Sequence, residues 1–180
     1  MLDFLKLNFH SNAKPEAIVQ SGPVRFTVLT SRLLRLEYDP SKIFEDRPTQ
    51  VFWHRDLQAP EFNASINKEQ IRIETEHLRL TYDIQDFGFY HRFLQIELKE
   101  SGFIWKFGQE NKTNLGGTVR TLDRIDGSTP LNPGLISRTG WSLLDDSDSL
   151  VFNQDGWLEP RNAHPKAKDL YFFGYGHDYT

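Results

Sequence analysis

Apolar and polar residues alternate in short runs along most of this chain. In the first run, Val24, Phe26 and Val28 alternate with Arg25 and Thr27. The same period of two recurs at residues 34–38, 71–73, 78–82, 94–98 and 103–107. A period of two predicts β-strands that place one face on a core and the other face in water.

Turn formers separate these runs, and the segment 153–156 is the clearest case. It reads Asn-Gln-Asp-Gly between the apolar residues 150–152 and 157–158, which predicts a hairpin because glycine tolerates positive φ. No window of a dozen residues carries a helical stripe. Many short strands with few or no helices predict an all-β fold, an antiparallel sandwich or barrel in one domain.

Residues 108–140 break the pattern, because they are rich in Asn, Gly, Thr, Asp and Pro. Long irregular loops are uncommon in compact domains and often carry function. This loop contains Asp123 and Asp126, with Arg120 and Arg124 interleaved. Paired carboxylates can hydrolyse glycosides, but a spacing of three in a loop does not fix their separation. Turn formation, contact with a polar ligand and direct catalysis are the three interpretations of these acids.

The acidic string at residues 145–148 resembles a calcium loop at first sight. An EF-hand numbered from Asp146 would need glycine and glutamate where the chain has Val151 and Trp157. A solvated turn between strands is therefore the better interpretation. The six histidines form no zinc-binding pair and there is no cysteine, so we expect no metal and no cofactor.

The four tryptophans divide into two pairs by their sequence context. Trp53 and Trp105 lie within strand patterns, where we expect them to pack in the core. Trp141 and Trp157 follow glycines at strand starts, so they stay open for stacking on sugar rings.

Charge and hydropathy exclude two classes of partner. The formal net charge is −4 and no basic cluster occurs, which argues against nucleic acid. No apolar run approaches the roughly 20 residues that span a bilayer, which argues against a membrane. The first residues include Asp3 and lack the apolar stretch of a secretory signal, so a cytoplasmic location is expected. Association into a homo-oligomer is left open.

The last residues, 169–180, are apolar and dense in aromatic side chains. A self-contained domain usually ends in polar residues that tolerate fraying. We therefore expect the polypeptide to continue beyond this point. On that expectation an exposed apolar surface forms around Leu170, Tyr171, Phe172, Phe173 and Tyr175.

Several strings, in order along the chain, together resemble the N-terminal domain of glycoside hydrolase family 31. They are residues 25–38, 44–51, 114–118, 133–141 and 169–179. His54 departs from the family pattern, which more often has Asn before the arginine at position 55. The resemblance covers most of residues 24–179.

The resemblance implies a β-sandwich of the galactose-mutarotase-like (supersandwich) type over residues 1–168. Residues 169–180 would then begin the connection to a catalytic (β/α)8 barrel. That barrel carries the catalytic aspartates of the family, so this chain is expected to contain no catalytic residue. The loop from residue 114 to about 127 resembles the family's loop at the rim of the sugar pocket, which makes Asp123, Arg124 and Asp126 candidate substrate-binding residues.

The parent protein would then be a retaining α-glycosidase, α-glucosidase-like in the broad sense, acting through a covalent intermediate. The partners implied are an α-linked glycoside and the barrel of the same polypeptide. A stand-alone carbohydrate-binding or mutarotase-like protein is the first alternative. A purely structural domain without sugar contact is the second.

Overall fold

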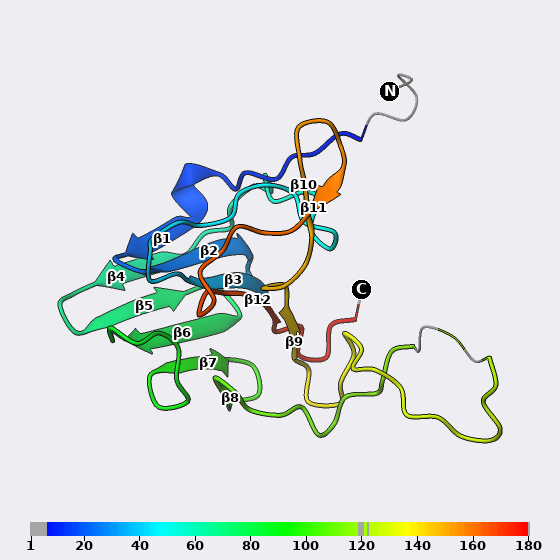
Figure 1. Ribbon diagram of the computed structural model, residues 1–180. Coiled ribbons are helices and arrows are strands. Elements are labelled where there is room, and N and C mark those ends of the chain that lie inside the picture. Colours follow the sequence, from blue (N-terminus) through cyan, green and yellow to red (C-terminus); the bar gives the residue numbers. More distant parts are fainter. Residues whose placement is uncertain (1–6, 119–120, 122, 180) are drawn as a thin grey trace.

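The computed structural model describes residues 7–118, 121 and 123–179, which form two antiparallel sheets that share one core (Figure 1). The first sheet has the strand order β1-β2-β3-β12-β9, and the second has the order β4-β5-β6-β7-β8. A separate two-stranded hairpin pairs β10 with β11. The predicted all-β antiparallel sandwich is confirmed.

The first sheet comprises β1 (Ile18–Ser21), β2 (Val24–Thr30), β3 (Leu33–Tyr38), β12 (Lys168–Phe173) and β9 (Ser142–Asp145). The second sheet comprises β4 (Asn63–Ile66), β5 (Gln70–Glu74), β6 (Leu78–Asp83), β7 (Leu94–Leu98) and β8 (Phe103–Lys106). The hairpin strands are β10 (Val151–Phe152) and β11 (Leu158–Glu159). One 3-10 turn, η2 (Pro15–Ala17), is the helical element of the described residues, and no helix in this part of the chain is long and apolar enough to cross a bilayer.

The core lies between the two sheets and takes alternate residues from most of their strands. Its buried side chains include Phe26, Leu36 and Phe172 from the first sheet and Ile73, Leu80 and Ile96 from the second. Trp105 of β8 is fully buried, and its ring centroid lies 5.0 Å from that of Phe172 in β12. This contact joins the two sheets near the edge of the second one.

The second sheet follows the period-two prediction. In β6 the buried residues Leu78, Leu80 and Tyr82 alternate with partly exposed polar ones. On the outer face Arg79 lies opposite Glu97 of β7, and its Nη1 atom donates to Glu97 Oε2 at 2.6 Å. Opposite charges paired directly across strands stabilise a sheet modestly.

The first sheet departs from the prediction, because its polar face is also buried. Arg25, Arg35 and Glu37 should face water by their sequence pattern, yet all three are buried. Residues 39–62 and 146–167 provide covering contacts on this face; Arg55, for example, donates from Nε to Tyr171 Oη at 2.7 Å. The prediction of a solvated face is wrong here, since a local pattern does not show that distant segments fold over it.

The C-terminal aromatic run forms β12, an interior strand of the first sheet that pairs with β3 on one side and with the edge strand β9 on the other. Leu170, Tyr171 and Phe172 are buried within this chain, so the expected apolar surface is wrong for them. Phe173 and Tyr175 keep partial exposure. The boundary placed after residue 168 falls inside a strand of the sandwich, whereas a continuation into a barrel stays a prediction.

Two further strands, β1 and β4, were not predicted. The four residues of β4 are all exposed and include Asn63 and Ser65, so no apolar alternation marks them. Their pairing with β5 decides the conformation.

The tryptophan predictions divide evenly. Trp105 is in the core and Trp157 is open, with 67% of its surface exposed, as expected. Trp53 is 37% exposed rather than buried, and Trp141 is buried rather than open. Trp141 stacks on Phe172, with ring centroids 6.1 Å apart, because β9 pairs with β12.

Replacing Phe172 with alanine tests the contact between the sheets. We expect Phe172→Ala to lower the free energy of unfolding by about 3–5 kcal/mol, because it leaves a cavity against Trp105 and Trp141. Urea unfolding followed by circular dichroism measures this loss. Ile104→Ala in β8 is the control, because Ile104 is 46% exposed. Equal losses in both variants would contradict a core at this position.

Candidate functional site

The described residues between 108 and 140 form an arm that leaves the sandwich after β8 and returns to it at β9 (Figure 1). The part of the arm beyond its base extends away from both sheets. It contains the loop that the sequence marked as irregular. Arg120, which the sequence places between Asp123 and the base of the loop, lies outside the described residues.

The two halves of the arm are held side by side by backbone hydrogen bonds. Leu115 N donates to Ile136 O at 2.9 Å, and Gly117 N donates to Asn132 O at 2.7 Å. The arm therefore has a paired inner part, although none of its described residues lies in a named strand.

Asn114 organises this pairing with its side chain. Its Oδ1 atom accepts from Gly116 N and Gly134 N, both at 2.9 Å, and its Nδ2 atom donates to Gly134 O at 2.7 Å. A Cβ atom at Gly134 would lie 2.6 Å from Gly116 O. Glycine is therefore needed where the two halves meet.

The base of the arm is joined to the segment that follows β12. Ser137 N donates to Tyr175 Oη at 2.5 Å, and Gly176 N donates to Gly140 O at 2.8 Å. A Cβ atom at Gly140, whose φ is 73°, would lie 2.3 Å from Gly176 O. The arm and the C-terminal segment thus share one end of the sandwich.

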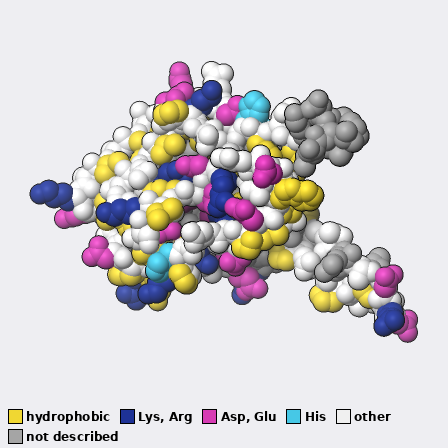
Figure 2. Space-filling model, turned by 45° about the horizontal axis from the view of Figure 1, so that its top comes forward, with side chains coloured by type: hydrophobic (Ala, Val, Ile, Leu, Met, Phe, Trp, Pro, Cys, Tyr) yellow, Lys and Arg dark blue, Asp and Glu magenta, His cyan; other side chains and the backbone are white. Residues whose placement is uncertain are grey.

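The candidate residues Asp123, Arg124 and Asp126 are all exposed on the outer part of the arm. Figure 2 shows charged side chains at the end of this projection. The backbone N–H of Asp123 donates to Thr121 Oγ1 at 3.1 Å, and Arg124 has a φ of 61°. Asp123, Arg124 and Asp126 make no side-chain hydrogen bond or ion pair with another described residue.

Apolar side chains on the arm are exposed as well. Each keeps between 45% and 53% of its surface in solvent: Leu115, Leu131, Leu135 and Ile136. The sandwich does not cover them. Exposed apolar groups that gather on a projection are typical of a surface that meets a partner.

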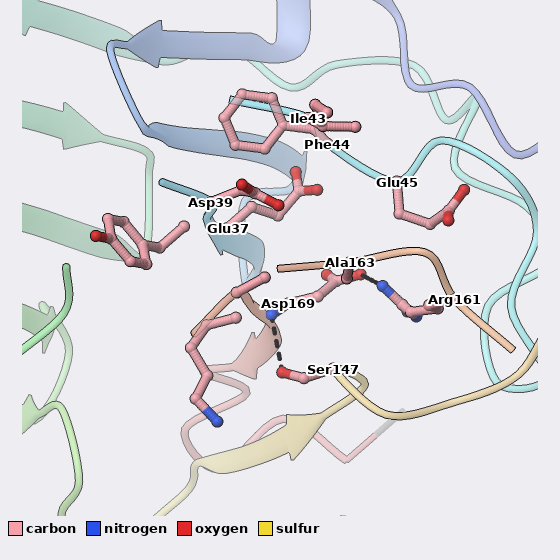
Figure 3. Close-up of a pocket in the computed structure, with 12 residues that line it drawn as sticks. Glu37, Asp39, Ile43, Phe44, Glu45, Ser147, Arg161, Ala163 and Asp169 are labelled. Carbon is pink, nitrogen blue, oxygen red and sulfur yellow. Dashed lines mark hydrogen bonds and ion pairs between the residues drawn. The ribbon is translucent and has the colours of Figure 1, made fainter. Parts of the chain in front are cut away.

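A second concentration of charge is buried on the first sheet, and part of it is drawn in Figure 3. We call it the buried charge cluster: Arg25, Arg35, Glu37, Asp146, Arg161 and Asp169. Arg35 binds Asp169 through two bonds of 2.8 Å, and Arg161 bridges Asp169 at 2.8 Å and Asp146 at 2.9 Å. Arg25 binds Glu37 through bonds of 2.7 and 2.9 Å.

The pKa values of the acids in this cluster shift in opposite directions. Burial would raise the pKa of Asp169, but the charges and hydrogen bonds of Arg35 and Arg161 outweigh it and lower the pKa to about 2. Burial prevails at Glu37 and at Asp146, so their pKa values are raised.

The buried charge cluster is structural rather than catalytic. The cavity beside it has a volume of about 20 Å3, which is too small for a sugar ring. Asp146 is fully buried, so the interpretation of residues 145–148 as a solvated turn is wrong for this residue. No group of three or more His, Asp or Glu side chains in the described part of the chain is arranged to hold a metal ion.

Comparison with protein-family models and with curated proteins gives no match for this chain.

Sequence reasoning missed the role of Asn114 and the depth at which the charges of the first sheet lie. The signal for Asn114 was its place two residues before a glycine pair, where an Asn side chain commonly bonds to the backbone. No local signal marks Arg35 or Asp169 as buried, because the segments that cover them are far away in the sequence.

Asp169→Asn tests the buried charge cluster. At pH 7 the variant should lose stability, by about 3–5 kcal/mol, because Arg35 and Arg161 keep buried charges without a full counter-charge. An aspartate whose pKa falls from about 3.9 in the unfolded chain to about 2 stabilises the fold above pH 4 and loses this effect between pH 4 and pH 2. The variant should therefore lose less stability than the wild type over that interval.

Thermal unfolding at several pH values measures both effects. Asp148→Asn is the matched control, because Asp148 is exposed and its side chain has no partner among the described residues. Parallel curves for the wild type and Asp169→Asn from pH 4 to pH 2 would show that Asp169 does not carry the lowered pKa.

Proposed function

We propose that this chain is the non-catalytic N-terminal β-sandwich domain of a retaining α-glycosidase of glycoside hydrolase family 31. In this proposal the sandwich, of the galactose-mutarotase-like type, supports the catalytic barrel. The arm contributes to the pocket that recognises the sugar. The resemblance along residues 25–179 supports the choice of this family.

The arm is the observation that carries this proposal. It is paired internally through Asn114, fixed at its base by Tyr175, and exposed at its end. A projection with this construction presents side chains at a defined distance from the sandwich. Its apolar residues suit contact with a folded partner, and its acids suit contact with a polar ligand.

The position of the C-terminal segment supports the same proposal. Residues 174–179 lie against the base of the arm, through the bonds of Gly176 and Tyr175. A barrel that follows this segment would start beside the arm. The proposal therefore requires the gene to encode alternating strands and helices after position 180, which sequencing of the gene tests directly.

Within the pocket, Asp123 and Asp126 would accept hydrogen bonds from sugar hydroxyls, and Arg124 would donate to a ring or hydroxyl oxygen. Charge-assisted bonds of this kind are short and directional. A site built to bind a hydroxyl rejects an analogue that lacks it, because its own polar group is left unpaired.

Asp123→Ala and Asp126→Ala, made separately in the full-length enzyme, test this role. We expect at least one of them to lower kcat/KM. The loss of transition-state stabilisation calculated from that decrease should be roughly 1–3 kcal/mol, the cost of leaving a buried polar group without its partner. The melting temperature should hardly change, since exposed loop substitutions usually stay within about 0.5 kcal/mol.

Asp86→Ala is the control, because Asp86 is an exposed acid of the β6–β7 connection without a side-chain partner among the described residues. It should leave both kinetics and melting unchanged. Wild-type kinetics in both arm variants would make the arm a spacer and would favour the purely structural alternative.

The 180-residue chain by itself should have no glycosidase activity. The catalytic aspartates of the family belong to the barrel, and no carboxylate pair in this sequence matches the family's catalytic motif. Assays of the purified chain with aryl α-glycosides check this expectation. Turnover that persists in a preparation free of contaminants would overturn the non-catalytic assignment, and interconversion of sugar anomers would favour the mutarotase-like alternative.

A further inference from the structure

A groove lies between the N-terminal residues 7–12, the residues 44–48 and the hairpin of β10 and β11. Its volume is about 1240 Å3. Pockets for small molecules usually enclose about 300–1,000 Å3, so this groove has room for an extended ligand. It is formed by other segments than the arm, and nothing in the proposed function uses it.

Trp157 forms an aromatic wall of the groove, and the hairpin turn holds it in place. Asn153 Oδ1 accepts from the N–H groups of Asp155 and Trp157, both at 3.0 Å, and Asn153 N donates to Trp157 O at 2.8 Å. Trp157 keeps 67% of its surface in solvent. A fixed backbone thus presents a large, flat aromatic group to the outside.

The apolar base of the hairpin is packed firmly. Phe9 and Phe152, which also line the groove, lie with ring centroids 4.8 Å apart, and Trp53 packs edge-on against both of them. The groove is therefore backed by an aromatic cluster that belongs to the fold.

The charges that line the groove are mostly neutralised by neighbours. Arg47 binds Glu45 through bonds of 2.8 Å and also pairs with Glu159, and Asp46 pairs with Arg25 at 2.6 Å. No arginine or lysine among the described lining residues is left unpaired. An anionic ligand such as a phosphate would find no free cation here.

The polar groups that stay free are chiefly amides. Asn8, Asn12 and Gln154 are exposed, and their side chains make no hydrogen bond to a described residue. Asp155 adds one free carboxylate beside Trp157. Amides both donate and accept, so this set matches a neutral ligand rich in hydroxyl groups.

We propose that this groove binds a neutral oligosaccharide. One sugar ring packs its C–H face on the indole of Trp157, whose ring face carries partial negative charge. The hydroxyl groups at the edge of the ring bond to Asp155 and to the amides of Asn8, Asn12 and Gln154. The site is separate from the arm and belongs to the chain whether or not a barrel follows it.

Titration of the 180-residue chain with a linear α-1,4-linked glucose heptamer tests the proposal, with calorimetry as the readout. We expect saturable binding, and we expect Trp157→Ala to weaken it at least about tenfold, as for other aromatic anchors. Tyr90→Ala is the matched control, because Tyr90 is an aromatic residue 50% exposed on the β6–β7 connection. It should bind like the wild type.

Tryptophan fluorescence gives a second readout that a general loss of folding would not mimic. Trp105 and Trp141 are buried, so a soluble quencher acts mainly on Trp53 and Trp157. The sugar should protect the wild type from quenching. In Trp157→Phe this protection should disappear while the melting temperature stays unchanged.

Three results would overturn the proposal. The first is that neither the heptamer nor a β-1,4-linked glucose hexamer, tested beside it, binds to the chain. The second is equal binding by the wild type and Trp157→Ala. The third is that the full chain does not bind the sugar but a chain without residues 1–6 does, which would mean that the N-terminal residues and not a sugar are the natural occupant of the groove. None of these results bears on Asp123 and Asp126, whose kinetics test the proposed function separately.

Discussion

The fold depends on the charges buried on the outer face of the first sheet. Arg35 lies between Asp169 and Glu37, and Arg161 closes the cluster from the covering segments. Moving such ions out of water costs several kcal/mol each unless partners replace the lost hydration. The covering segments are therefore fixed in place, because Arg161 and the backbone oxygen of Glu45 complete the coordination of the sheet residues. The irregular covering segments, residues 39–62 and 146–167, are thus held against the first sheet.

The arm shows the opposite solution. Its inner part is satisfied by its own hydrogen bonds through Asn114 and Gly134, but its apolar residues have no cover from the sandwich. An ordered projection with exposed apolar side chains is typical of a surface that contacts another folded domain. The tie between Ser137 and Tyr175 places that surface at the end of the sandwich where β12 finishes.

The arm and the groove differ in physical character, and this difference separates their proposed roles. The arm offers carboxylates and a guanidinium at the end of an exposed loop, which suits the rim of a larger pocket. The groove offers Trp157 on a firm aromatic base, with amides around it and with its charges mostly cancelled. One surface would act with a partner, and the other would act alone.

The sequence alone determined the all-β class, because alternation at residues 24–28, 78–82 and 94–98 is a local property of a strand with one buried face. It also determined that Asp123, Arg124 and Asp126 lie in an exposed loop, since turn formers surround them. Tertiary structure decided what no local pattern records: that Arg35 and Asp169 are buried, that residues 170–172 belong to an interior strand, and that Trp141 is buried whereas Trp53 is partly exposed. Each of these outcomes depends on contacts between segments that are distant in the sequence. These contacts form only when the chain folds, and they determine which side chains are buried.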